Sequence, residues 1–160
     1  MTTATAAATR QRDDAKPILL SQYYTDLLSW PTTIAPDTGE VQLRLGETID
    51  ALVMRARFGG EVNHQLVQAM LHVPIIIVPG AKVVDWVFLT QPRTPMRRST
   101  IDDLMAAEVG WYDADDTIAL PAFGATEGDL RWLQCPEARA ELPSWETIVG
   151  AVRRTFMRTW

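Results

Sequence analysis

The feature that most constrains the fold is one short stretch in the first half of the chain, Gly46 to Arg57. After its opening glycine comes a nearly unbroken apolar run, residues 49–54, followed by Arg55 and Arg57. An apolar run of this length is typical of a strand that is buried on both faces. The rest of the chain must therefore cover both faces of a central strand, and two cations stand where that strand ends.

Helical and strand patterns alternate along the remaining sequence. Apolar residues at helical spacing predict helices in residues 17–28, 61–72 and 144–160, with a short helix after Thr100. Alternating or β-branched runs predict strands in residues 32–35, 41–45, 75–78, 83–90, 117–120 and 130–134. This order predicts one mixed α/β (α+β) domain over residues 17–160, with a mixed sheet flanked by helices. Residues 1–16, rich in Thr and Ala and then charged, are expected to be a flexible tail.

Local signals predict where several of these elements begin and end. Gly59-Gly60 is expected to break the chain between the buried strand and the next helix. Thr100 and Asp103 have the spacing of a capping box, which predicts a helix start at that point. Ser144 is expected to cap the last helix.

Composition narrows the possible functions. The chain of 160 residues has a formal net charge of −5, which argues against broad, non-specific binding of nucleic acid. A single cysteine, Cys135, excludes an internal disulfide and a multi-cysteine zinc site, and it is expected to be a buried structural thiol. No run approaches the roughly 20 apolar residues of a membrane span, so a cytoplasmic protein without membrane contacts is expected.

Several short motifs, taken in order, resemble the amino-terminal primase–polymerase (prim-pol) domain of the archaeo-eukaryotic primase superfamily. The resemblance covers roughly residues 17–147, and each motif alone is weakly specific. It is carried by Tyr23-Tyr24 leading to Ser29-Trp30-Pro31, Leu45-Gly46 before the buried strand, Gly80 followed by Trp86 to Leu89, Leu120-Pro121-Ala122 with Gly128 to Leu133, and Leu142-Pro143-Ser144-Trp145. It implies a primase–polymerase-like α/β fold, in a family whose chemistry is two-metal nucleotidyl transfer.

The residues needed for that chemistry are not where the resemblance places them. The family has an Asp-x-Asp pair at the end of the buried strand, and here Arg55 and Arg57 stand there. Asp85-Trp86 stands where the family histidine is expected, and the third acidic position falls near Gly110. The resemblance therefore implies a degenerate, non-catalytic domain without cofactor or metal, acting as a binding or regulatory module. A protein partner or self-association is favoured.

Two other functions remain open at this point. An active nucleotidyltransferase would have to use other acids, and Asp113, Asp115 and Asp116 are the nearest, although a polar turn accounts for them better. A remnant that binds nucleotide or nucleic acid would use the arginines on one electropositive face, namely Arg55, Arg57, Arg93, Arg97 and Arg98. Arginine suits phosphate because its guanidinium forms bidentate hydrogen bonds. The alternative for these arginines is an ordinary surface role, with ion pairs to acids such as Glu61.

The last helix suggests an interface. Its apolar stripe, which runs from Trp145 to Trp160, is longer than the edge of a small core requires. Phe156 and Trp160 at its distal end are therefore candidate contact residues for a partner or a second copy, with neighbouring arginines as in interface hot spots. The alternative is that the helix packs on its own core along its whole length.

Overall fold

The computed structural model of the chain describes residues 16–159. Its centre is a five-stranded antiparallel sheet with the strand order β6-β3-β5-β4-β8. These strands are β3 (Asp50–Arg55), β4 (Ile75–Pro79), β5 (Val84–Thr90), β6 (Gly110–Trp111) and β8 (Arg131–Gln134). The predicted buried strand is β3. It lies between β5 and β6, and four of its six residues are buried, namely Asp50, Ala51, Leu52 and Met54.

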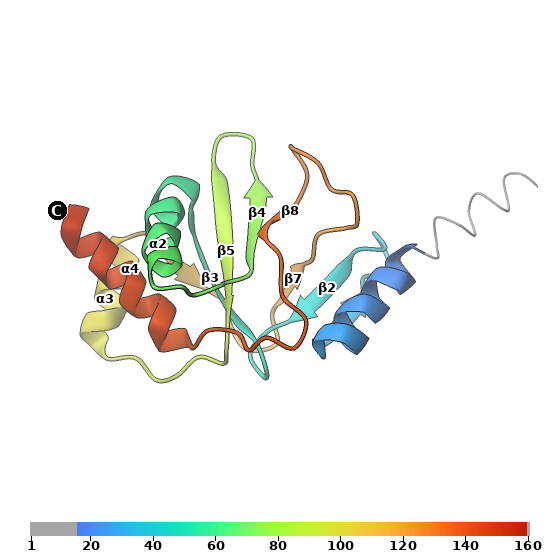
Figure 1. Cartoon of the computed structure of the whole chain (residues 1–160), viewed down its shortest axis with the longest axis horizontal. Helices are drawn as coiled ribbons and strands as arrows, with labels where there is room; N and C mark the ends of the chain where they lie inside the picture. Colours follow the sequence, from blue (N-terminus) through green and yellow to red (C-terminus); the bar gives the residue numbers. More distant parts are fainter. Residues whose placement is uncertain (1–15, 160) are drawn as a thin grey trace, which may run out of the picture.

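A second, smaller antiparallel sheet contains β1 (Thr32–Ile34), β2 (Val41–Arg44) and β7 (Thr117–Ala119), with β2 in the middle. Beside it lies the amino-terminal helix, which spans residues 16–28 among those described and includes a π-helical segment, η1 (Tyr23–Leu27). Three further helices, α2 (Ala56–Gln68), α3 (Arg98–Ala106) and α4 (Trp145–Thr159), lie at the other end of the molecule (Figure 1). The predicted α+β class is confirmed, and the strands divide between two sheets.

Each face of the large sheet has its own hydrophobic core, because side chains alternate along each strand. Leu52 and Met54 of β3 join the helix-side core, which includes Trp145 and Ile148 of α4. Ala51 joins the small-sheet-side core, together with Leu20, Tyr24, Trp30, Val41, Leu43 and Leu89. The chain thus covers both faces of the central strand, as its apolar sequence requires.

The prediction of a chain break at Gly59-Gly60 is wrong. Helix α2 begins at Ala56, directly after β3, and both glycines lie inside it. A Cβ on Gly59 would lie 3.1 Å from Trp86 Cε3 and 3.4 Å from Phe88 Cε2. The absence of a side chain at Gly59 therefore allows the helix to approach the sheet closely. Helix α2 also ends earlier than predicted, at Gln68.

The two predicted helix starts have different outcomes. Helix α3 begins at Arg98 rather than after Thr100, and Asp103 binds Arg153 of α4 at 2.8 Å instead of closing a capping box. Helix α4 starts as predicted, and Ser144 Oγ accepts a hydrogen bond from the Thr147 amide at 3.1 Å.

The amino-terminal prediction is only partly within the described residues. Lys16 is already helical, whereas the flexible tail was expected to include it. Residues 1–15 lie outside the described part of the chain. No helix among the described residues is long and apolar enough to cross a membrane.

Candidate functional site

The two arginines at the end of the buried strand belong to different elements. Strand β3 ends at Arg55, and Arg57 is the second residue of α2, so strand alternation does not continue to it. Arg55 lies opposite Asp85 of β5, and its Nη1 donates to Asp85 Oδ1 at 2.9 Å. The predicted surface ion pair is formed, but with Asp85 rather than with Glu61.

The surroundings of the Arg55–Asp85 pair are acidic. Tyr112 lies near it, and burial, followed by the charges of Asp85 and Asp116, raises the pKa of the Tyr112 phenol. The carboxylates of Asp85 and Asp116 thus act on this side of the sheet, and the guanidinium of Arg55 is already paired with Asp85. This leaves Arg55 poorly placed to bind a further anion.

Arg57 lies in a groove between the helices, and Arg55 lines one part of it. A hollow of about 580 Å³ lies between the start of α2, the end of α3 and Phe156 of α4, and Arg55, Phe58 and Glu61 also line it. A second hollow of about 390 Å³ lies between α2 and α4, and its lining includes His64 and Arg158. The two hollows share Arg57 and Glu61, and we refer to them together as the α2–α4 groove.

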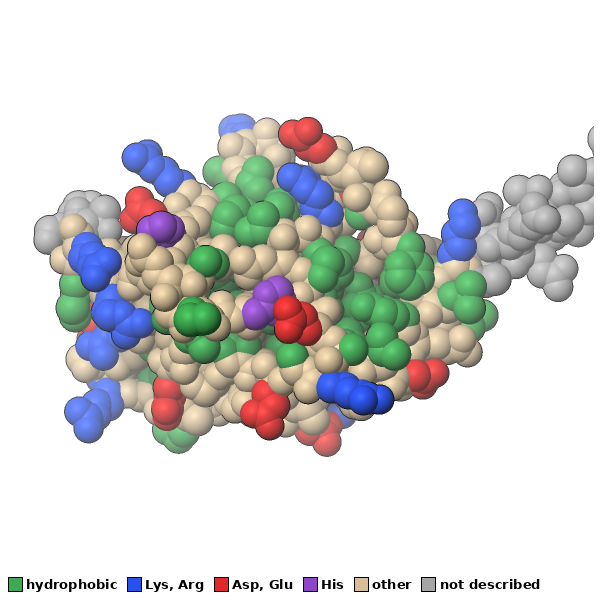
Figure 2. All heavy atoms as spheres, viewed as in Figure 1, with side chains coloured by type: hydrophobic (Ala, Val, Ile, Leu, Met, Phe, Trp, Pro, Cys, Tyr) green, Lys and Arg blue, Asp and Glu red, His purple; other side chains and the backbone are tan. Residues whose placement is uncertain are grey.

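The two parts of the α2–α4 groove differ in chemistry. The first has an apolar lining of Phe58, Ala106, Ala107 and Phe156. The second holds Arg57 and Arg158, with His64 beside them and Glu61 as its acid. No side-chain hydrogen bond or ion pair joins Arg57 or Arg158 to another residue of the described part of the chain. Figure 2 shows the blue Lys and Arg side chains gathered at its left end, over α2 and α4.

The remaining predicted arginines lie apart from this groove. Arg93 follows β5 at the opposite end of β3 from Arg55; its amide donates to Asp50 Oδ2 at 2.8 Å and its Nη1 to the Tyr112 carbonyl at 3.4 Å. Arg97 precedes α3, and Arg98, its first residue, pairs with Asp102 at 3.0 Å. The structure therefore does not bring the five predicted arginines together around one point.

The acidic residues Asp113, Asp115 and Asp116 form a turn. The Asp113 amide donates to Asp116 Oδ2 at 2.8 Å, and Asp115 has a positive φ of 69°. Between residues 16 and 159, no group of three or more His, Cys, Asp or Glu side chains is arranged to hold a metal ion.

The predicted interface residues are only partly described. Phe156 is half-buried and lines the α2–α4 groove, and Trp160 lies outside the described residues. The apolar positions nearer the start of α4, from Trp145 to Val152, are buried in the helix-side core. The prediction that Cys135 is buried is wrong. Its side chain is exposed in the loop after β8, where its carbonyl contacts His72 Nε2 at 2.6 Å.

Arg158, His64 and Phe58 are groove residues that the sequence did not single out. Arg158 is basic and near a helix end, which is common for reasons of helix stability alone. The sequence signal that could identify the groove is the spacing of Arg57, Glu61 and His64, which lie at four- and three-residue steps along one face of α2. This spacing can be recognised only if α2 is known to begin before the two glycines.

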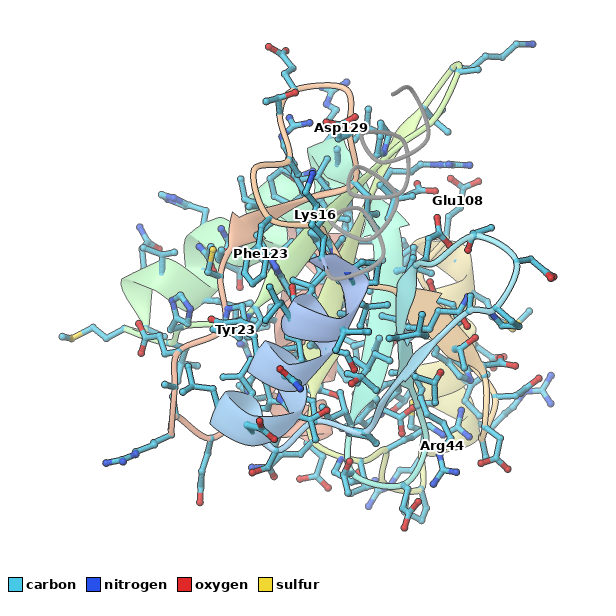
Figure 3. The ribbon with its side chains drawn as sticks, turned by 90° about the vertical axis from the view of Figure 1, so that its right-hand side faces the viewer. Lys16, Tyr23, Arg44, Glu108, Phe123 and Asp129 are labelled. Carbon is cyan, nitrogen blue, oxygen red and sulfur yellow. The ribbon has the colours of Figure 1, made fainter. Side chains whose placement is uncertain are left out.

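A larger hollow lies at the other end of the molecule. It measures about 670 Å³ and lies between the amino-terminal helix, the small sheet and the loop of residues 122–130. Figure 3 shows this end, with Phe123 beside Tyr23 and with Lys16 and Asp129 on the same face. The ring centroids of Phe123 and Tyr23 are 5.8 Å apart in an edge-to-face arrangement.

Comparisons of the chain with protein families, with curated proteins and with solved structures give no match.

Proposed function

We propose that the chain is a non-catalytic binding module with a primase–polymerase-like scaffold, which docks a protein partner in the α2–α4 groove. The observation that carries this proposal is the pairing of an apolar trough, lined by Phe58 and Phe156, with two arginines, Arg57 and Arg158, that have no described partner. Aromatic side chains and arginine are the residues most enriched in interface hot spots. The expected ligand is a protein segment with an apolar side chain next to one or more carboxylates.

The chemistry of the groove favours a protein over nucleic acid. Glu61 and Glu108 stand in the lining beside the arginines and would repel a run of phosphates. The chain as a whole carries a net charge of −5, which opposes the counterion-release binding that nucleic acids require. An apolar trough suits a side chain of a folded partner better than it suits a phosphate backbone.

The test is affinity capture from the native cell with matched charge variants. Arg57→Glu with Arg158→Glu reverses the groove charges, and Lys82→Glu with Arg139→Glu makes the same change in net charge at exposed sites elsewhere. We expect the wild type and the control variant to capture the same proteins. The groove variant should capture at least about tenfold less of them, because like charges then oppose docking. Capture that is equal for the two variants would rule out the groove as the binding face.

The enzymatic alternative has its own test. We expect neither Mn²⁺ nor nucleotide to raise the melting temperature, since any ligand that binds the folded state must stabilise it by mass action. Template-directed nucleotide incorporation that is lost on changing Asp113, Asp115 and Asp116 to Ala would refute the non-catalytic proposal.

A further inference from the structure

We infer that the groove accepts the loop of residues 122–130 from a second copy of the chain, so that copies join head to tail. This inference rests on the proposed function, because it names the occupant of the same α2–α4 groove. Three observations carry it, namely the distribution of charge, the chemistry of the loop and the positions of the two surfaces.

Charge is unevenly divided between the two ends of the molecule. The small-sheet end (residues 16–49 and 112–130) has nine acidic residues, and its two basic residues are Lys16 and Arg44. The acidic residues are Asp26, Asp37, Glu40, Glu47, Asp113, Asp115, Asp116, Glu127 and Asp129. At the other end, the three helices α2, α3 and α4 together carry five basic and four acidic residues, and α4 alone has three arginines against Glu146. A strongly acidic end favours contact with the arginines at the other end of a second copy.

The loop of residues 122–130 has the composition that the groove requires. Phe123 is 63% exposed, Glu127 and Asp129 are exposed acids, and no residue of the loop is basic. Phe123 suits the apolar trough between Phe58 and Phe156, as an edge-to-face or offset aromatic contact. The carboxylates then lie within a few residues of it and suit Arg57 and Arg158.

The acidic part of the loop is already ordered. The amide and Oγ1 of Thr126 donate to Asp129 Oδ2 at 3.1 and 3.2 Å, and the Asp129 amide donates to the Thr126 carbonyl at 3.0 Å. Glu127 makes no hydrogen bond or ion pair with another described residue, so its carboxylate needs no release before docking. A loop held in shape loses less conformational entropy on binding.

The two surfaces lie at opposite ends of the long axis. Helices α2 and α4, whose residues line the groove, are at the left of Figure 1, whereas Phe123 and Asp129 are on the right-hand face that Figure 3 presents. A chain cannot therefore place its own loop in its own groove. A contact between two different patches is heterologous, and it extends into rings or filaments instead of stopping at a symmetric dimer.

The expected contact is small, involving one loop and one groove, which places it in the weak and transient class with a Kd of about 10–100 µM. Sedimentation velocity on the full chain should show a sedimentation coefficient that rises steadily between about 10 and 500 µM, beyond the value for a dimer. A wild-type chain that stays monomeric over that range overturns the inference. So does an assembly that stops at a dimer.

A charge exchange makes the test specific. Arg57→Glu with Arg158→Glu makes the groove acidic, and Glu127→Arg with Asp129→Arg makes the loop basic, so each variant alone should stay monomeric. Their equimolar mixture restores both complementary pairs, and it should associate at least about tenfold more tightly than either variant alone. A mixture of folded variants that does not associate overturns the inference.

Phe123→Ala provides an independent check, because it leaves every hydrogen bond of the Thr126–Asp129 turn in place. It should weaken wild-type association by about tenfold or more, as the loss of a buried aromatic anchor does. Unchanged association in this variant contradicts the assigned occupant. If the wild type proves monomeric but still captures a cellular protein in an Arg57- and Arg158-dependent way, this inference fails while the proposed function stands.

Discussion

At the residue scale, Gly59 shows how one position sets the distance between a helix and a sheet. A methyl group there would press on Trp86, Met54 and Phe88 at 3.1–3.4 Å, and two of these side chains are almost fully buried. We expect Gly59→Ala to lower the free energy of unfolding by about 1–2 kcal/mol, because overpacking exceeds the gain of about 1 kcal/mol in helix propensity. Urea unfolding followed by circular dichroism would measure it.

The neighbouring glycine supplies the control. A Cβ on Gly60 would meet Trp86 Cη2 at 3.9 Å, an ordinary contact. Gly60→Ala should therefore stabilise the protein by up to about 1 kcal/mol. Equal effects of the two substitutions would contradict the close approach at Gly59.

Tyr24 is a second residue with an identifiable energetic role. Its hydroxyl donates to the Pro121 carbonyl at 3.1 Å and accepts from Trp132 Nε1 at 3.0 Å. Tyr24→Phe leaves both of these partners unsatisfied in the core, so we expect a loss of about 1–3 kcal/mol in the free energy of unfolding at neutral pH. Trp132→Phe removes one of the two hydrogen bonds and provides a comparison.

The same tyrosine predicts how stability depends on pH. Burial raises the pKa of Tyr24 from 10.0 to about 12, so the folded state holds its proton more tightly than the unfolded chain does. Its contribution is complete below pH 10 and is lost as the pH rises towards about 12. Urea unfolding at pH 9 and pH 11 should show a smaller fall for Tyr24→Phe than for the wild type. A fall of the same size in both would refute this assignment.

At the scale of elements, the three helices that cover the large sheet begin differently. Ser144 caps α4 through the Thr147 amide, whereas α2 and α3 begin after Arg55 and Arg97 without a side-chain cap. We expect Ser144→Ala to cost about 1 kcal/mol and Ser144→Asp to restore most of it. Thermal unfolding of the three proteins would decide, and a neutral Ser144→Ala would show that packing alone fixes the start of α4.

The sequence predicts most elements of this fold because their patterns are local. The alternation in β2, the β-branched run in β4 and the cap of α4 are each determined within a few residues. The local pattern misplaces the start of α2, because Gly59 is needed for close packing against Trp86, a residue distant in sequence. The two-residue strand β6 gave no periodic signal, since it pairs with β3 through only Gly110 and Trp111.

The candidate site was less predictable than the fold. The sequence shows Arg55 and Arg57 as a pair, but one belongs to a strand and is paired with Asp85, whereas the other belongs to a helix. The partners of Arg57 in the groove, Phe156 and Arg158, lie about a hundred residues away in the sequence. Only the packing of α4 against α2 brings them together.

At the scale of the whole molecule, the two hydrophobic cores share one sheet and should unfold together. Adjacent residues of the same strand point into different cores, such as Ile75 and Ile76 in β4. Loss of either core would expose one complete face of the large sheet to water. The free energy needed to do this is comparable with the whole stability of an ordinary domain.

This coupling can be tested with one substitution in each core. Leu104→Ala removes a fully buried side chain from the helix-side core, and Leu43→Ala removes one from the small-sheet-side core. Each should lower the free energy of unfolding by about 2–5 kcal/mol.

Far-UV circular dichroism mainly follows the helices, and near-UV circular dichroism follows the packed aromatic rings of both cores, among them Trp145 on the helix side and the stacked Tyr24 and Trp30 on the small-sheet side. Both signals should give one coincident transition in each variant, since a two-state domain loses its cores together. If Leu43→Ala split the near-UV transition into two steps, the small sheet and the amino-terminal helix would be a separate folding unit.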